Sequence, residues 1–93
     1  MVEEPVSKDT LLKRLKRIEG QIRGIQKMIE NGRECESIIT QLGAVRSAID
    51  GVGALVLKNY MTLCFREGNN TELEGINSLA RAIALWGRVH TGD

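Results

Sequence analysis

The sequence predicts an all-α protein in which each chain folds into three helices. Apolar residues recur at alternating steps of three and four over most of the chain, which is the period of amphipathic helices. Pro occurs once, near the N-terminus, so the chain lacks the turn residues that an all-β domain needs. With 93 residues there is room for one hydrophobic core, and we expect a single domain over 1–93.

The first helix is expected over about 9–31, after a flexible tail at 1–8. Ser7, Asp9 and Thr10 offer caps for its start. Its apolar residues form a heptad seam that stops at Asn31-Gly32, a pair typical of a helix C-terminus. The seam consists of Leu11, Leu15, Ile18, Ile22, Ile25 and Ile29.

The second helix is expected to be long, over about 33–66. Its seam keeps the heptad spacing with Asn59 as a polar interruption, and consists of Ile38, Leu42, Val45, Ile49, Val52, Val56 and Leu63. Small residues gather near its middle, at Ala44, Ser47, Ala48, Gly51 and Ala54. They suit either tight packing within one subunit or close contact between two copies of this helix, and we favour the second interpretation.

The third helix is expected over about 71–89, because Thr71 and Glu74 have the spacing of a capping box. Three helices of such unequal length leave apolar surface on the long second helix. Self-association is the simplest way to cover this surface. We therefore expect two helical hairpins to form an antiparallel four-helix-bundle dimer.

The two cysteines lie near opposite ends of the second predicted helix. Along one helix Cys35 and Cys64 would be about 44 Å apart, so they cannot form a disulfide within the chain. If two helices pair antiparallel about a two-fold axis near Ile49-Asp50, Cys35 of one chain faces Cys64 of the other. The alternative is that both are buried cysteines acting as small apolar residues.

Composition narrows the chemistry that these thiols can perform. Zinc usually takes four nitrogen or sulfur ligands, and the chain offers two Cys and His90, near the C-terminus. Two thiolates could hold Cu(I), and two thiols can exchange sulfur without a metal.

No apolar run approaches the ~18 residues of a membrane span, so no membrane partner is expected. Two Cys without a secretory context indicate the cytoplasm, where thiols are kept reduced.

The first helix is strongly basic although the net charge of the chain is +1. Asp9 and Glu19 oppose a group of seven cations, which are Lys8, Lys13, Arg14, Lys16, Arg17, Arg23 and Lys27. A run of charge is usually a solvated face, but here the balancing acids are few. A two-fold dimer would repeat this surface, which favours nucleic-acid phosphates as the partner. Arg46 and Lys58 add positive charge on the second helix.

Two stretches resemble the copper-sensitive operon repressor family. They are Leu15-Lys-Arg-Ile-Glu-Gly-Gln-Ile-Arg-Gly-Ile25, and Cys35 followed by Gln41-Leu-Gly-Ala-Val-Arg-Ser-Ala48. The resemblance covers roughly Leu11 to Arg66. It implies an all-α repressor, assembled as a dimer of dimers, that releases its operator when an effector reaches the Cys site. It also implies that Arg14, Arg17 and Arg46 contact DNA.

One position departs from the pattern of this family. The resemblance implies that copper sensors carry a His four residues before the second Cys, whereas this chain has Tyr60 there. A neutral phenol is a poor ligand for Cu(I). The nickel, cobalt and formaldehyde sensors of the family also need His that this chain lacks. Two Cys without this His are similar to the CsoR-like sulfurtransferase repressor subgroup, which senses persulfides and polysulfides.

We therefore expect a cytoplasmic, DNA-binding transcriptional repressor that is not an enzyme and needs no cofactor. Cys35 and Cys64 of a second copy would sense reactive sulfur, while Lys13, Arg14, Lys16, Arg17 and Arg46 would contact operator DNA as a homodimer or homotetramer. The alternative in the same class is a Cu(I) sensor that uses the same two thiolates. A thiol redox enzyme and a helical scaffold with incidental Cys are weaker alternatives.

Overall fold

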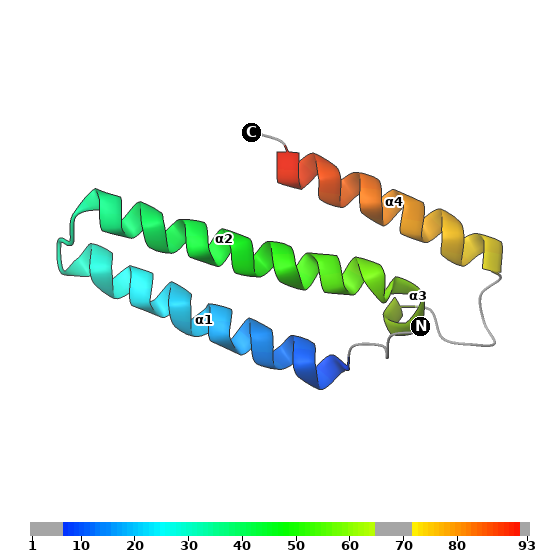
Figure 1. Cartoon of the computed structure of the whole chain (residues 1–93), viewed down its shortest axis with the longest axis horizontal. Helices are drawn as coiled ribbons and strands as arrows, with labels where there is room; N and C mark the ends of the chain where they lie inside the picture. The colour runs from blue at the N-terminus through cyan, green and yellow to red at the C-terminus, as the bar shows by residue number, and fades with distance from the viewer. Residues whose placement is uncertain (1–6, 65–71, 92–93) are drawn as a thin grey trace, which may run out of the picture. The chain divides into compact units, whose positions relative to one another are not determined.

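The computed structural model describes residues 7–64 and 72–91, and all of its regular structure is helical. Four helices follow one another, α1 (Lys8–Glu30), α2 (Cys35–Lys58), α3 (Tyr60–Cys64) and α4 (Glu72–Thr91) (Figure 1). The predicted all-α class is therefore confirmed. Among the described helices, none is long and apolar enough to cross a membrane.

Helix α1 begins and ends where its capping residues predict. The hydroxyl oxygen of Ser7 accepts a 3.0 Å hydrogen bond from the amide of Thr10, which satisfies a free donor of the first turn. At the other end the amide of Arg33 donates to the carbonyl of Met28 at 2.9 Å, across Gly32 with φ +69°. This is a Schellman motif, in which glycine adopts the left-handed backbone without a steric penalty.

The second predicted helix is divided in the structure. Helix α2 ends at Lys58, Asn59 forms a turn, and α3 continues for five residues. The side-chain amide of Asn59 donates a 2.9 Å hydrogen bond to the carbonyl of Leu55, so it competes with the backbone for that acceptor. The prediction of one uninterrupted helix over 33–66 is therefore wrong at Asn59, and residues 65–66 lie outside the described part.

The described chain divides into two compact units, and the boundary in the sequence falls between Val52 and Gly53. In the first unit, over 7–52, α1 and the N-terminal part of α2 lie side by side as an antiparallel hairpin (Figure 1). Its buried core consists of Ile18, Ile25 and Val45, with Ile38, Ala48 and Val52 packed against them. The second unit contains the end of α2 with α3 and α4, and α4 contacts α3.

The hairpin buries only one edge of each predicted apolar seam. Ile18 and Ile25 of α1 are buried, whereas Leu15, Ile22 and Ile29 of the same seam are 44–59% exposed. On α2, Val45 is buried and Leu42 and Ile49 are exposed. The apolar stripe on each helix is thus wider than its partner helix covers, and the uncovered edges form an apolar surface on the hairpin.

Candidate functional site

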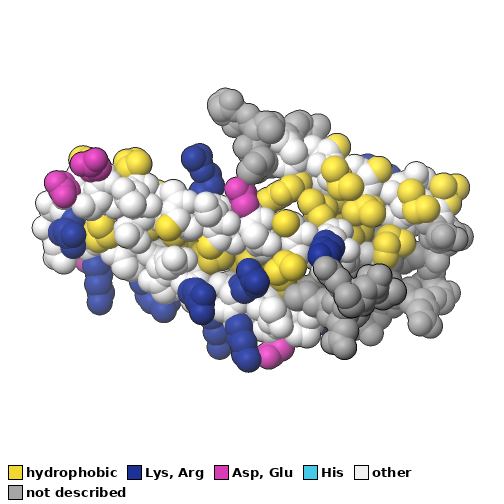
Figure 2. Space-filling view, viewed as in Figure 1, with side chains coloured by type: hydrophobic (Ala, Val, Ile, Leu, Met, Phe, Trp, Pro, Cys, Tyr) yellow, Lys and Arg dark blue, Asp and Glu magenta, His cyan; other side chains and the backbone are white. Residues whose placement is uncertain are grey.

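The polar half of α1 presents cations to solvent. Lys13, Arg14, Lys16 and Arg17 are all exposed, and Lys and Arg side chains gather over α1 (Figure 2). Thr10, Lys13, Arg14 and Arg17 line a surface hollow of about 310 Å³. Lys13 Nζ lies 3.4 Å from Asp9 Oδ2, but both side chains are more than 70% exposed, so this pair holds Lys13 only weakly. The sequence prediction of an outward basic face on α1 is borne out by these positions.

Arg14 differs from its basic neighbours because it reaches α2. Its Nη1 atom lies 3.9 Å from the position that a Cβ would occupy at Gly51. Ala48, one turn earlier on α2, is half-buried against the hairpin core. These two members of the small-residue group therefore pack against α1 within one subunit. The contact between two copies of this helix stays a prediction.

Cys35 is the first residue of α2, and its free thiol is exposed. Four further residues share its face of the helix at steps of four and three, and all of them are exposed. We call this face the open stripe; it consists of Cys35, Ile39, Leu42, Arg46 and Ile49. Ile39, Leu42, Gly43 and Arg46 line a hollow of about 260 Å³ on it. Arg46 therefore lies among apolar side chains on α2, and not with the cations of α1.

Tyr60 is held by a contact that its position in the sequence does not reveal. Its hydroxyl shares a 2.8 Å hydrogen bond with the hydroxyl of Ser78 on α4, at a partly buried site. The phenol oxygen thus has a protein partner within its own chain. Gly75, Ser78 and Ala82 are the small residues on this side of α4, and their spacing of three and four is the signal that could have indicated a packing face there.

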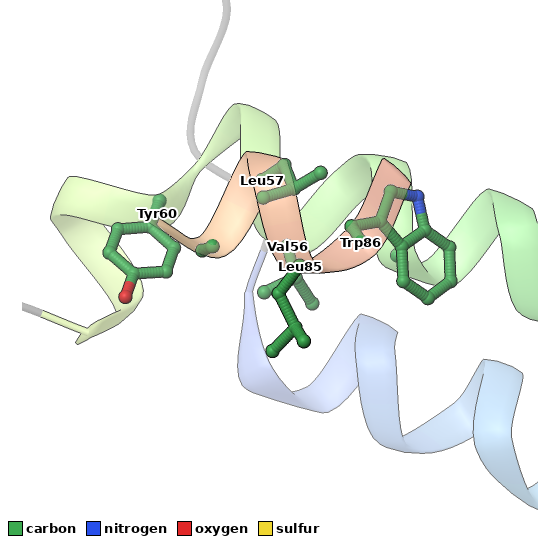
Figure 3. A pocket seen from close by; sticks show the side chains of 7 residues that line it. Val56, Leu57, Tyr60, Leu85 and Trp86 are labelled. Atoms are coloured by element: carbon green, nitrogen blue, oxygen red, sulfur yellow. The ribbon is translucent and has the colours of Figure 1, made fainter. Parts of the chain in front are cut away.

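The ring of Tyr60 also lines an apolar hollow of about 370 Å³. Figure 3 shows Tyr60 and Trp86 at opposite ends of this hollow, with Val56, Leu57 and Leu85 between them. Trp86 packs directly on Gly53, where a Cβ would collide with the indole ring. The glycine therefore allows the tryptophan of α4 to approach the α2 backbone.

Cys64 is the last residue of α3, and its side chain lies outside the described part of the structure. The pairing of Cys35 with Cys64 of a second copy stays a prediction. His90 and Thr71 also fall outside the described side chains. Within the described residues, no group of three or more His, Cys, Asp or Glu could hold a metal ion.

The fold and these surfaces define a class of protein: a small all-helical chain whose hairpin carries a cationic face on α1 and a free thiol at the start of α2. Comparison with known proteins identifies the family. Residues 7–85 match the sequence model of the metal-sensitive transcriptional repressors, and the chain belongs to this family. The family resemblance stated from the sequence is confirmed.

Two relatives of known name are copper-sensing transcriptional repressors. The chain is 47% identical to the copper-sensing transcriptional repressor CsoR of Bacillus subtilis over 57 residues, which are 61% of this chain and 56% of the relative. It is 44% identical to the copper-sensing transcriptional repressor RicR of Mycobacterium tuberculosis over 57 residues, 61% of this chain and 59% of the relative. The matched region thus spans a little more than half of each relative's length.

A solved structure agrees over nearly the whole chain. The nickel-responsive transcriptional regulator InrS superposes with a TM-score of 0.75 at 34% identity, over 92% of this chain and 99% of the other. These relatives are named as transcriptional repressors or regulators, and none of the three is named as an enzyme. Family membership therefore agrees with the prediction that the protein is not an enzyme.

Proposed function

We propose that the protein is a DNA-binding transcriptional repressor that senses reactive sulfur species, namely persulfides or polysulfides, through Cys35 of one copy and Cys64 of another. The observation that carries this proposal is the state of Tyr60. The family resemblance implies that copper sensors have a metal-binding His at this position. This chain has Tyr60 instead, and its hydroxyl is hydrogen-bonded to Ser78. The site then offers two thiols without an imidazole at position 60, which suits sulfur exchange better than metal coordination.

The DNA-binding part of the proposal rests on α1. Lys13, Arg14, Lys16 and Arg17 are exposed on one helix, and three of them line a shared hollow. Cations arranged in this way suit the phosphates of duplex DNA, whose neutralisation releases counterions. The helix is not part of a helix-turn-helix motif, so we expect backbone contacts and DNA shape to contribute most of the recognition.

The two-copy part of the proposal is supported by the apolar surface of the hairpin. Covering the exposed seam residues of α1 and the open stripe of α2 with a second hairpin would remove them from water. An antiparallel pair of α2 helices would bring Cys35 of each copy to the α3 end of the other. The family resemblance implies that two such dimers assemble into a homotetramer.

The sulfur chemistry requires only the effector and the two thiols. A cysteine thiolate attacks the outer sulfur of an organic persulfide RSSH, which yields a protein persulfide and the thiol RSH. The thiolate of the second cysteine then attacks the inner sulfur of this persulfide, which is the Sγ atom of the first cysteine. This step forms an intersubunit disulfide and releases the outer sulfur as H₂S. Two protein persulfides give a trisulfide and H₂S. A tetrasulfide forms when a further RSSH accepts the two electrons and becomes RSH and H₂S.

Cu(I) sensing is the second candidate, because two relatives are named as copper-sensing repressors. The same two thiolates would bind the ion, since soft sulfur ligands select Cu(I). Tyr60 would then have no part in coordination. Titration of the reduced protein with Cu(I) against a strong chelator distinguishes the candidates, because the sulfur sensor should bind Cu(I) weakly and should keep its operator in the presence of Cu(I).

The first experiment is the intact mass of the reduced protein after exposure to an organic persulfide, measured denatured and without reductant. We expect a covalent dimer. Its mass should correspond to two chains joined by a disulfide, or to two chains with one or two added sulfur atoms for a trisulfide or a tetrasulfide. Cys35→Ala and Cys64→Ala should each bind operator DNA as before and lose its persulfide-dependent release. A monomer unmodified at both Cys, or full release in either variant, would contradict the proposal.

A further inference from the structure

The family resemblance implies that Arg14, Arg17 and Arg46 contact DNA. Arg46 differs from the two arginines of α1 because it lies on α2 among apolar side chains. It belongs to the open stripe and lines a hollow with Ile39, Leu42 and Gly43. No ion pair is formed by Arg46 within the described residues. A cation on the face that a second copy is expected to cover would lose its water on association. Such a desolvated charge is costly unless an anion accompanies it.

The symmetry of the expected contact brings an acid to Arg46. If the two-fold axis passes between Ile49 and Asp50, Asp50 of a second copy lies opposite Ile49. Asp50 of the second copy is then offset from Arg46 by three residues along the helix axis, or about 4.5 Å. The axes of packed helices lie about 8–10 Å apart, a gap that the long arginine side chain and the aspartate side chain bridge together. Asp50 is half-buried and follows Arg46 by one turn, so both lie toward the same flank of α2. Its carboxylate can accept several hydrogen bonds at once.

We propose that Arg46 and Asp50 of a second copy form an ion pair, twice in each dimer, that fixes the antiparallel register of the two α2 helices. This inference rests on the shared two-thiol site of the proposed function. A parallel pairing would instead place Arg46 beside Arg46 of the other copy, which like-charge repulsion disfavours. Apolar side chains of the open stripe supply area for association, and the charges select the register that brings Cys35 beside Cys64 of the second copy.

A charge-swap cycle tests this proposal in the full-length reduced protein. Arg46→Asp and Asp50→Arg should each raise the dissociation constant of the dimer at least tenfold, measured by sedimentation velocity over a range of protein concentrations. The double variant restores opposite charges with their positions exchanged and should return to within about threefold of wild type. Arg23→Asp is the control, because it makes the same change on an exposed arginine of α1.

Thiol cross-linking provides a separate measure of register. A short bismaleimide should join Cys35 to Cys64 in the wild type, and peptide mapping should find more Cys35–Cys35 links in the single variants. Circular dichroism of each variant checks that the helices are retained.

Three results would overturn the proposal, and they differ in what they imply. Single variants that self-associate as wild type would show that Arg46 does not set the register, although the shared thiol site would stand if the Cys35–Cys64 link still formed. Single variants with unchanged association but weaker operator binding would identify Arg46 as a DNA contact. A wild-type protein that neither associates nor cross-links would remove the shared site itself.

Discussion

Replacing Gly53 with alanine tests the packing of α4 most directly. An added Cβ would lie 2.7 Å from Cη2 and 2.8 Å from Cε2 of Trp86, both well inside van der Waals contact. The atoms in contact belong to the rigid indole ring, so the clash cannot be relieved by rotating the end of a flexible side chain. Either Trp86 or the backbone of α4 has to move.

Two opposing effects determine the size of the change. Alanine favours a helix interior over glycine by about 1 kcal/mol, whereas overpacking a filled site costs about 1–3 kcal/mol. We therefore expect Gly53→Ala to lower the free energy of unfolding by up to about 2 kcal/mol. Gly24→Ala is the matched control, because nothing lies within 4 Å of its added Cβ. It should raise the free energy of unfolding by about 0.5–1 kcal/mol.

The assay is urea unfolding at one fixed protein concentration, since association contributes to apparent stability. Trp86 is the single tryptophan of the chain, so its fluorescence reports on this site alone. We expect a red-shifted emission in folded Gly53→Ala and no shift in Gly24→Ala. If both variants gain the same stability with unchanged emission, Trp86 does not pack on Gly53 and the reasoning fails.

Three further predictions concern single contacts. Tyr60→Phe should lower the free energy of unfolding by about 0.5–1.5 kcal/mol by removing the hydrogen bond to Ser78. Ser78→Ala should cost a similar amount, and the double variant should cost little more than either; strictly additive losses in urea unfolding would contradict the bond. Ser7→Ala should destabilise the protein by about 1 kcal/mol through loss of the α1 cap, whereas Ser7→Gly should cost a few tenths; equal stability of both variants and wild type would show that the cap is unimportant. Arg17→Ala should reduce the slope of log K against log salt for operator binding by about 0.9, and an unchanged slope would show that this side chain contacts no phosphate.

The sequence was a reliable guide where structure depends on local chemistry. The heptad seam, Ser7 and the Asn31-Gly32 pair together predict α1, and the Schellman motif forms at the predicted glycine. Asn59 shows the limit of this reasoning. Periodicity continues through it, but whether its side chain bonds to solvent or to the carbonyl of Leu55 depends on geometry that the apolar pattern does not contain.

The candidate site was predicted in part. The outward cations of α1 follow from their spacing against the apolar seam, and the structure has them exposed. Spacing did not predict which small residues of α2 pack against α1, because small residues occur on two neighbouring faces of this helix. Ala48 and Gly51 belong to the face that meets α1, whereas Arg46 belongs to the open stripe. The link from Tyr60 to Ser78 joins residues far apart in the chain, so only tertiary packing reveals it.

Arg14 is where the proposed sensing and DNA-binding surfaces of the hairpin come together. Its guanidinium is exposed with the cations of α1, yet it lies against Gly51 of α2, next to the expected two-fold axis at Ile49-Asp50. A sulfur link between Cys35 and Cys64 of two copies would constrain α2 along this axis. Any shift of α2 there would change the surface against which Arg14 rests. The proposed release of DNA would then require only a small rearrangement of α2, without unfolding of the basic helix.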